Sequence, residues 1–315
     1  MGRYLVTGGA GFIGSHIAER LLRDGHEVRI LDNLATGKRE NVEAIRPAGP
    51  GRLEWLEEDV RDLAACRRAC AGVEYVLHEA ALGSVPRSVE NPGETTAVNV
   101  LGTVNVFQAA REAKVRRVVW ASSSSVYGDT PTLPKHEQMP LSPRSPYAAG
   151  KLAGEEFARV FAGTMDLPVV SLRYFNVFGP RQDPDSQYAA VIPRFIRALV
   201  EGKRPTVYGD GEQSRDFTYV DNVVQVNLAA CGKGPGRGEV VNVACGDRYT
   251  LNDLLRCLEK ILGVKADPEY LPPRAGDVRH SQAAIDQAVS LFGFQPTVGF
   301  EDGLARTVEH FRRAD

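Results

Sequence analysis

The fold of this 315-residue chain is decided by the stretch Leu5-Val6-Thr7-Gly8-Gly9-Ala10-Gly11-Phe12-Ile13-Gly14. A short β-rich run, Tyr4 to Thr7, leads straight into the glycine cluster, which opens a helical pattern from Phe12 to Arg23. Glycines permit a tight turn and the close approach of a pyrophosphate, whose charge the amides and dipole of a helix N-terminus hold. Alone, the cluster is weak evidence, because other α/β proteins also contain tight turns.

An acidic residue at the end of the second strand makes the signal more specific. Asp32 closes the predicted strand Glu27 to Leu31, 18 residues beyond Gly14, where a carboxylate would accept hydrogen bonds from an adenosine ribose. The same carboxylate would repel a 2′-phosphate, so the sequence favours NAD over NADP. Asp59-Val60 follows the third strand and could hold the adenine amine, with an ordinary helix cap as the alternative.

Strand and helix patterns alternate through the first half of the chain, which is typical of a parallel sheet covered on both faces. The predicted strands are Tyr4 to Thr7, Glu27 to Leu31, Leu53 to Glu57, Tyr75 to Leu77, Arg117 to Ser122 and Val169 to Arg173. The predicted helices are Phe12 to Arg23, Asp62 to Cys70, Thr95 to Ala113 and Pro146 to Phe161.

We therefore predict an α/β fold, a Rossmann-type doubly wound parallel sheet with a smaller mixed α/β C-terminal substrate domain. The NAD-binding domain is expected over 1–175 and the substrate domain over 176–315, with a soft boundary because later segments could rejoin the first sheet. In the second half the pattern predicts a helix from Ala189 to Glu201, a strand from Val240 to Ala244 and two or three final helices.

Composition excludes several classes of protein. Lys plus Arg total 38 against 40 Asp plus Glu, for a net charge of −2, so no basic excess suggests nucleic acid or an anionic membrane. No stretch approaches the roughly 18 apolar residues of a membrane span and the start does not resemble a signal peptide, so we expect a cytoplasmic protein. Cys66 and Cys70 lack a second ligand pair at suitable spacing, so no metal site is expected.

A second set of residues indicates catalysis. Tyr147 and Lys151 are four residues apart, which places both on one helix face, and the serine run Ser122 to Ser125 ends the preceding strand, where open α/β sheets place ligands. Lowering a tyrosine pKa by about three units takes roughly 4 kcal/mol, which one cation at about 4 Å supplies at an effective dielectric near 20. Lys151 could therefore make Tyr147 a base, with a serine hydroxyl bridging to the substrate oxygen.

Together these motifs resemble the extended short-chain dehydrogenase/reductase superfamily, over nearly the whole chain. Within it, longer segments resemble the UDP-hexose 4-epimerases, especially those acting on UDP-N-acetylglucosamine. These segments are His78 to Ser88, Leu172 to Pro184, Tyr188 to Pro193, Ser214 to Phe217 and Arg274 to Ser281.

The resemblance implies a role for each matching residue. Ser123, Tyr147 and Lys151 would be catalytic, and Asn176, Arg215 and Arg274 would hold the diphosphate, with Asp277 near the uridine ribose. The residues expected to bind NAD are Gly8, Gly11, Phe12, Ile13, Asp32, Asn33, Asp59, Val60, Ala80, Ala81, Ser122, Tyr147, Lys151 and Tyr174. The residues expected to bind the UDP-sugar are Ser84, Ser124, Asn176, Gln182, Ala190, Val191, Tyr208, Arg215, Arg274, Asp277 and Ser281.

The resemblance also separates related reactions. Relatives that dehydrate or decarboxylate nucleotide sugars typically carry an acid just before the Val-Tyr-Gly segment, where this chain has Ser125. We therefore expect epimerisation at C4 through a transient 4-keto sugar, with UDP-glucuronate decarboxylase, 4,6-dehydratase and reductase as alternatives. A bulky tyrosine in one pocket wall favours plain hexoses, and Ser281 at the matching position predicts that N-acetylated sugars are also accepted.

Two other functions stay open, a non-catalytic nucleotide-binding protein and a net oxidoreductase, and we also expect a homodimer. A non-catalytic nucleotide-binding protein would usually have lost Tyr147, Lys151 or a glycine of the motif, and none is missing. A net oxidoreductase would use an exchangeable nicotinamide cofactor. Asp32 disfavours NADP in that role but leaves exchangeable NAD open. The helices Thr95 to Ala113 and Pro146 to Phe161 match those that form a four-helix dimer interface in similar enzymes, so we expect a homodimer.

Overall fold

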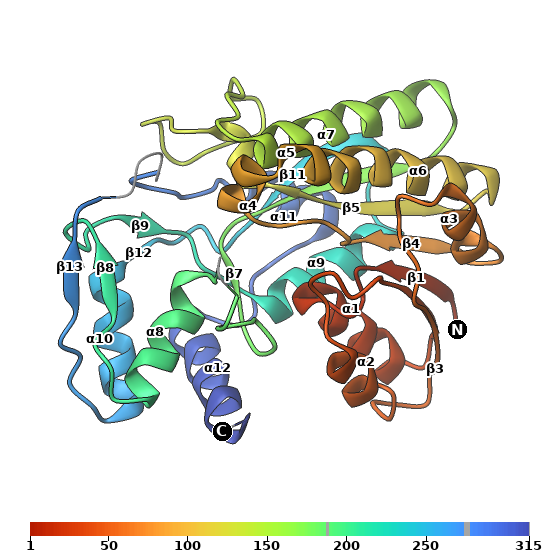
Figure 1. Ribbon diagram of the computed structural model, residues 1–315. Helices are drawn as coiled ribbons and strands as arrows, with labels where there is room; N and C mark the ends of the chain where they lie inside the picture. Colours follow the sequence, from red (N-terminus) through yellow and green to blue (C-terminus); the bar gives the residue numbers. More distant parts are fainter. Residues whose placement is uncertain (187–188, 274–277, 315) are drawn as a thin grey trace.

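A seven-stranded, wholly parallel sheet forms the centre of the computed structural model, which describes residues 1–186, 189–273 and 278–314 (Figure 1). The strand order is β11-β6-β5-β4-β1-β2-β3, in which the run 6-5-4-1-2-3 is the Rossmann arrangement. The strands are β1 Arg3–Thr7, β2 Glu27–Leu31, β3 Arg52–Leu56, β4 Tyr75–His78, β5 Arg117–Ser123, β6 Val169–Tyr174 and β11 Arg237–Val243. The predicted fold class is confirmed.

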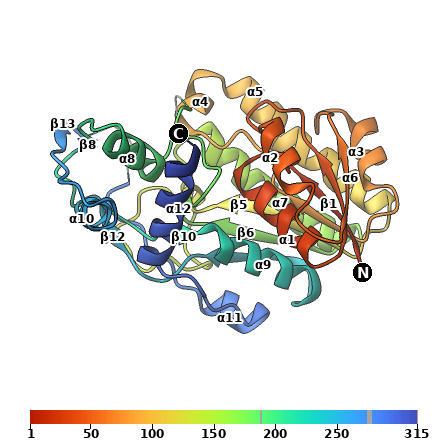
Figure 2. The same cartoon turned by 90° about the horizontal axis from the view of Figure 1, so that it is seen from below.

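Helices cover both faces of this sheet, and the sequence of β1 shows why. Successive side chains of a strand point to opposite faces, so Leu5 packs into one core and Val6 into the other. One face carries α1 Phe12–Arg23, α2 Arg39–Ile45, α9 Val220–Gly232 and α11 Asp286–Phe292; the other carries α3 Leu63–Cys70, α6 Thr103–Glu112 and α7 Pro146–Thr164. Figures 1 and 2 show these two helical layers.

Short helical elements follow strands β4 and β5 at their carboxyl ends. After β4 come α4 Val85–Glu90, α5 Pro92–Thr96 and the π-helical segment η1 Ala97–Gly102, and after β5 comes the 3₁₀ turn η2 Ser124–Tyr127. The prediction of one helix from Thr95 to Ala113 was therefore wrong in detail, because α5, η1 and α6 follow one another. At η1, the Asn99 side chain bonds both the amide and the carbonyl of Leu82, which fixes the loop after β4.

A smaller group of elements packs around its own apolar core. It comprises β7 Val177–Phe178, α8 Val191–Val200, β8 Thr206–Tyr208, β9 Ser214–Arg215, β10 Thr218–Tyr219, β12 Tyr249–Thr250, α10 Leu251–Leu262, β13 Glu269–Leu271 and α12 Phe300–Ala314. The largest core contributions come from α8 and α10, which turn Phe195, Ile196, Leu254 and Leu258 inward. These elements lie to the left of the sheet in Figure 1.

The chain does not divide cleanly at residue 175. The helix α9, which the sequence pattern did not predict, packs on α1, and β11 then pairs in parallel with β6. The strand predicted from Val240 to Ala244 begins three residues earlier, at Arg237, and the helix predicted from Ala189 begins at Val191. No helix within the described residues has the length and apolar character that a bilayer crossing needs.

Candidate active site

The glycine loop packs so closely on itself and on the end of β4 that side chains would not fit at Gly8 or Gly14. Gly8 has φ +68°, and a Cβ there would lie 2.7 Å from the Ala80 nitrogen; a Cβ at Gly14 would lie 2.2 Å from the Gly8 oxygen. The helix α1 starts at Phe12, and its N-cap, Gly11, offers no side-chain hydrogen bond to the first turn. The first-turn amides are thus left for an anion, and this arrangement fits a dinucleotide pyrophosphate.

Asp32 holds the loop to the end of β2. Its two carboxylate oxygens accept hydrogen bonds from the Ala10 amide at 2.9 Å and from the Leu34 amide at 2.8 Å. Burial raises the pKa of Asp32, and these two bonds oppose the rise. Each carboxylate oxygen retains a second acceptor position, so Asp32 can both orient the loop and bind ribose hydroxyls.

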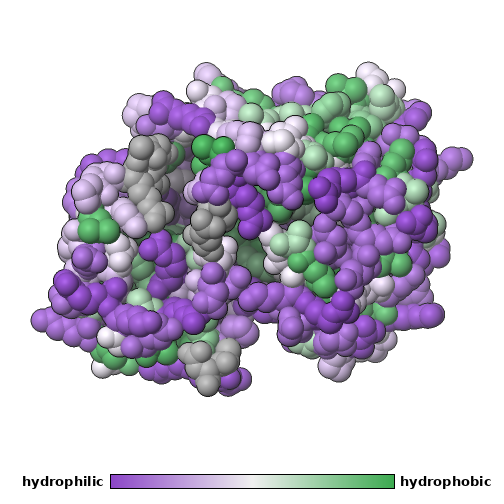
Figure 3. Space-filling view, in the orientation of Figure 1, coloured by the Kyte–Doolittle hydropathy of each residue, from purple (hydrophilic) through white to green (hydrophobic). Residues whose placement is uncertain are grey.

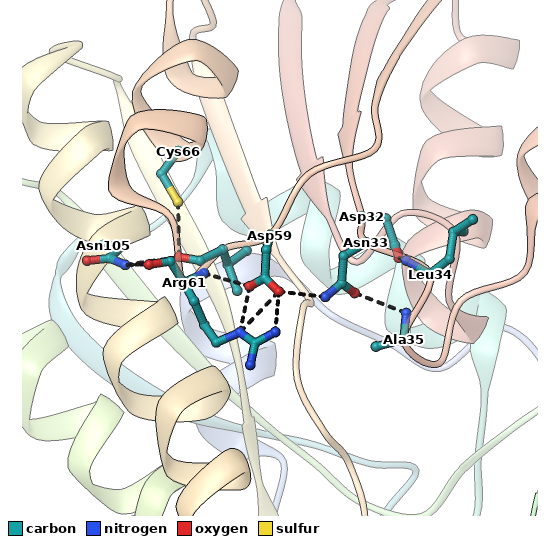
Figure 4. Close-up of polar contacts among 9 residues, drawn as sticks. Asp32, Asn33, Leu34, Ala35, Asp59, Arg61, Cys66 and Asn105 are labelled. Carbon is teal, nitrogen blue, oxygen red and sulfur yellow. Dashed lines mark hydrogen bonds and ion pairs between the residues drawn. The ribbon is translucent and has the colours of Figure 1, made fainter.

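The residues predicted at the adenine side lie together (Figure 4). The Asp59 carboxylate accepts bonds from Asn33 Nδ2 at 2.7 Å and from the Arg61 guanidinium, and Arg61 holds the pKa of Asp59 below its usual range. The alternative reading of Asp59 as a helix cap was wrong, because Asp62 caps α3 by accepting from the Ala64 amide. The neighbouring Val60 carbonyl accepts from Asn105.

A buried histidine, His78, fixes the position of the carboxyl end of β4 through hydrogen bonds to its neighbours. His78 lies between Thr7 Oγ1 at 2.6 Å and Thr103 Oγ1 at 3.1 Å, and burial lowers its pKa to about 3. Because the Thr103 hydroxyl donates to the Asn99 carbonyl, the neutral imidazole donates from Nε2 and accepts from Thr7. The Thr7 oxygen then accepts from the Ala80 amide. This chain of bonds holds Ala80 beside the glycine loop, and the role of Ala80 and Ala81 in binding NAD stays a prediction.

The structure brings the three predicted catalytic residues together. Ser123 ends β5, while Tyr147 and Lys151 lie on the first two turns of α7, which Ser145 caps through the Ala148 amide. Lys151 Nζ donates to the Ala121 carbonyl at 2.6 Å and lies 5.9 Å from the centre of the Tyr147 ring. The neighbouring Ser124 begins η2.

Burial shifts both titrating groups of this constellation. It raises the pKa of Tyr147, which the adjacent Ser123 side chain opposes, and it lowers the pKa of Lys151 to about 8. The expected lowering of the Tyr147 pKa by Lys151 is therefore not seen in this structure, because burial has the larger effect on the phenol. Residues Glu79 and Glu155 both support the charged form of Lys151. The ammonium, a hydroxyl and a phenol thus lie at the carboxyl end of a parallel strand, where proton transfer to a bound ligand is feasible.

Sequence reasoning missed the ion pair behind these residues. Arg173 and Glu155 are 1% and 0% exposed and are joined by two bonds, Nε to Oε1 at 2.8 Å and Nη2 to Oε2 at 2.7 Å. The Ser122 hydroxyl also donates to Glu155 Oε1 at 2.5 Å, so its proton is engaged with this pair, while its predicted contact with the cofactor stays a prediction. A spacing signal existed, because Glu155 lies four residues after Lys151, on the same face of α7.

Three of the predicted sugar-nucleotide residues, Asn176, Arg215 and Ser281, lie around β9. Asn176 Nδ2 donates to the Asp216 carbonyl, and the Ser281 amide donates to the Ser214 carbonyl beside Arg215. Asp216, another residue that sequence reasoning missed, is fully buried and accepts from the amides of Cys245, Gly246 and Ala283. It therefore holds together the two segments that carry Arg215 and Ser281.

The remaining predicted residues are more scattered. Tyr208 ends β8, Ala190 and Val191 begin α8, and Ser84 caps α4. Gln182 donates to the Val177 carbonyl and lines a cavity of about 520 Å³ together with Lys38 of the first domain and His310 of α12. Arg274 and Asp277 lie outside the described residues. Among the residues that are described, no cluster of three or more His, Cys, Asp or Glu side chains suits a metal ion.

Figure 3 shows the surface hollowed near the centre of the view, between the parts that carry α1 and α8 in Figure 1. Together, the glycine loop, Asp32 and the Ser123, Tyr147 and Lys151 constellation are typical of an NAD-dependent short-chain dehydrogenase/reductase. Comparison with known proteins agrees: residues 4–244 match the model of the NAD dependent epimerase/dehydratase family. The chain belongs to this family, and its cofactor is NAD.

Relatives that match over nearly all of both chains indicate which kind of enzyme within this family the chain is. A UDP-glucose 4-epimerase from Mycolicibacterium smegmatis is 41% identical over 312 residues, covering 98% of each chain. The structure of a UDP-N-acetylglucosamine 4-epimerase from Methanobrevibacter ruminantium is 40% identical with a TM-score of 0.94, covering 100% of this chain and 99% of that one. The structure of a Thermus thermophilus UDP-glucose 4-epimerase complex with NAD is 39% identical with a TM-score of 0.89, covering 99% and 100%. This chain is an NAD-dependent enzyme of the nucleotide-sugar 4-epimerase kind.

Proposed function

We propose that the enzyme interconverts UDP-glucose with UDP-galactose and UDP-N-acetylglucosamine with UDP-N-acetylgalactosamine. The observation that carries the reaction type is the meeting of Ser123, Tyr147 and Lys151 at the end of β5, in a serine run without a carboxylate. An acid would be needed there to continue from a 4-keto sugar to dehydration or decarboxylation. Its absence favours simple return of the hydride.

The roles of the residues follow from their chemistry. The glycine loop and Asp32 would hold NAD, which would supply the acceptor and donor of the hydride at C4 of the sugar. Tyr147 removes the proton of the C4 hydroxyl, with Ser123 bridging phenol and sugar oxygen, and Lys151 stabilises the phenolate that acts as base. The 4-keto sugar then presents its other face, and Tyr147 returns the proton. No net oxidation results, so one NAD serves many turnovers.

Substrate binding is assigned to the second part of the chain. Arg215 would hold the diphosphate, because a guanidinium forms forked bonds to phosphate oxygens, and Asn176 lies close by through its bond to the Asp216 backbone. Arg274 and Asp277 keep their proposed roles on the diphosphate and the uridine ribose. The small Ser281 leaves room for an N-acetyl group.

We also propose that the enzyme is a homodimer. Val89 of α4, Leu101 of η1 and Val160 of α7 are 63%, 52% and 47% exposed, which is unusual for large apolar side chains. Figure 3 shows apolar residues along the upper edge of the molecule, where Figure 1 shows α5 and α7. A second copy that covers this face would remove these apolar side chains from water.

The test is direct. Purified enzyme is denatured and its supernatant examined for NAD, and intact enzyme is incubated separately with UDP-glucose, UDP-N-acetylglucosamine and UDP-glucuronate, with products separated by chromatography. We expect retained NAD and conversion of the first two substrates to their C4 epimers. Formation of a stable 4-keto-6-deoxy sugar, release of carbon dioxide from UDP-glucuronate, or activity only with added NADH would overturn the proposal.

A further inference from the structure

One acidic side chain at the cofactor end of the sheet has no part in the mechanism above. Glu79 directly follows β4 and precedes Ala80-Ala81. Its backbone packs on the glycine loop, because a Cβ at Gly8 would lie 2.9 Å from the Glu79 carbonyl carbon. Glu79 therefore lies where the central strands β1 and β4 end, in the crevice that the cofactor is expected to occupy.

The carboxyl group is held in place by a directed chain of hydrogen bonds. Asn227 of α9 donates from Nδ2 to the Val223 carbonyl and to the Tyr174 hydroxyl, each at 2.8 Å, which fixes the orientation of its amide. The Tyr174 hydroxyl has one proton, and it lies 2.8 Å from Glu79 Oε1. Asn227 Oδ1 also lies within reach of this proton, at 3.1 Å. Because the Asn227 amide donates to Tyr174 and Glu79 Oε1 is the nearer of the two acceptors, the Tyr174 proton goes to the carboxylate.

The Glu79 carboxyl has no ion-pair partner among the described residues. In the parts of the chain that the structure describes, no Lys, Arg or His nitrogen lies within ion-pair distance of its carboxylate. Burial raises the pKa of Glu79 to about 7, while the Tyr174 bond and the charge of Lys151 favour its ionised form. Tyr174 belongs to the core on the α9 side, whereas Lys151 lies over Trp120 of the opposite core. The two charges thus reach the end of the sheet from opposite faces.

Opposite charges have opposite effects on a nicotinamide. The oxidised ring is a cation and the reduced ring is neutral, so a nearby carboxylate stabilises the oxidised form and a nearby ammonium disfavours it. An epimerase needs the two forms to be close in free energy, because the hydride must be both taken and returned. Lys151 is required for proton transfer, and its charge must therefore be balanced.

We propose that Glu79 is the balancing residue: its carboxylate offsets Lys151 and keeps the resting enzyme in the NAD⁺ form that can begin a turnover. This inference rests on the cofactor placement in the proposed function, but not on which sugar is converted. Tyr174 and Asn227 act as positioning residues for the carboxylate.

The experiment measures the redox balance of the bound cofactor and needs no substrate. Wild-type holoenzyme, Glu79→Gln and the control Glu137→Gln are equilibrated with mediators at a series of fixed potentials, and the near-ultraviolet absorbance of reduced nicotinamide is read. Glu137 is also a partly buried glutamate, but its carboxylate accepts from the Asn242 amide. We expect the reduced-to-oxidised ratio of Glu79→Gln to rise about tenfold at any one potential, a shift of about 30 mV for two electrons. The control should match wild type.

A second variant, Tyr174→Phe, tests the same proposal in case Glu79→Gln does not fold. Tyr174→Phe removes the donor that favours the ionised carboxyl, so we expect a shift in the same direction by a smaller factor. Unchanged ratios in both folded variants, or an equal shift in Glu137→Gln, would overturn the role of Glu79 and leave the epimerase proposal intact. Wild-type protein that retains no NAD would instead overturn the proposed function on which the inference rests.

Discussion

Arg173 and Glu155 form a fully buried ion pair behind the catalytic helix, with both guanidinium–carboxylate bonds between 2.7 and 2.8 Å. The pair joins β6 to α7 four residues beyond Lys151 and also receives the Ser122 hydroxyl. Because each charge satisfies the other away from water, removing one partner strands a buried charge.

Loss of one member of this pair should therefore be severe. We expect Arg173→Met to lower the free energy of unfolding by about 3–5 kcal/mol, measured by urea denaturation of the holoenzyme. The double variant Arg173→Met/Glu155→Met should regain much of that loss, because no charge remains unpaired. A double variant less stable than Arg173→Met alone would contradict this account.

Tyr147→Phe should separate catalysis from binding. It removes the phenolic oxygen that accepts the sugar proton but keeps the ring, so the rate should fall by about 10²–10⁴ while the affinity for UDP-sugar changes little. Steady-state rates and calorimetric binding measure the two effects. Tyr270→Phe, which alters an exposed tyrosine of β13, should retain full activity; a Tyr147→Phe enzyme as active as this control would eliminate Tyr147 as the base.

The glycine loop can be tested with a matched pair of substitutions. Gly8→Ala and Gly72→Ala both place a side chain at positive φ, +68° and +73°, but only the Cβ at Gly8 meets backbone atoms. Both should lose about 1–3 kcal/mol of stability from the strain of positive φ, and Gly8→Ala should lose more because its Cβ also meets backbone atoms. Only Gly8→Ala should also lose NAD, measured as cofactor released per protein after denaturation; equal retention by the two variants would disprove the assignment of the loop.

The preference between plain and N-acetylated UDP-hexoses is expected to depend on the size of the side chain at Ser281 in the wall of the sugar pocket. Ser281→Tyr should remove activity on UDP-N-acetylglucosamine and spare UDP-galactose, because the larger side chain fills the space for the N-acetyl group. Ser281→Ala serves as the control and should keep both activities. If Ser281→Tyr loses the two activities equally, the residue does not select the sugar.

Lys151 gives a prediction for pH. Burial lowers its pKa from 10.5 to about 8, so the unfolded chain binds this proton more tightly than the folded protein does. Stability from this group is therefore present above pH 10.5 and is lost as pH falls through about 8. Relative to Lys151→Met, wild-type unfolding free energy should rise by about 2–3 kcal/mol from pH 8 to 10.5. Denaturation at several pH values measures this trend, and a flat difference would contradict it.

The sequence predicted the elements whose signals are local. The glycine cluster, Asp32 and the Tyr147-x-x-x-Lys151 spacing depend on turn geometry and helical periodicity, and these features lie where they were predicted. The helix α9 and the short strands β7 to β10 were missed. The buried face of α9 includes the polar side chains Asn222 and Asn227, which breaks the apolar pattern of the helix. The strands β7 to β10 have only two or three residues each, and strands this short depend on tertiary contacts more than on their own propensity.

By itself, the sequence predicted the parallel sheet, the glycine loop and the placement of Tyr147 and Lys151 on one helix face, because each follows from residue types at fixed spacing along one strand or helix. Only the tertiary structure decided what surrounds them. The Arg173–Glu155 pair, the three amides on Asp216 and the bond from Tyr174 to Glu79 join residues 18 to 95 positions apart. Burial and charge pairing arise when distant segments meet, so chain packing, which spacing does not encode, sets the electrostatics of the site.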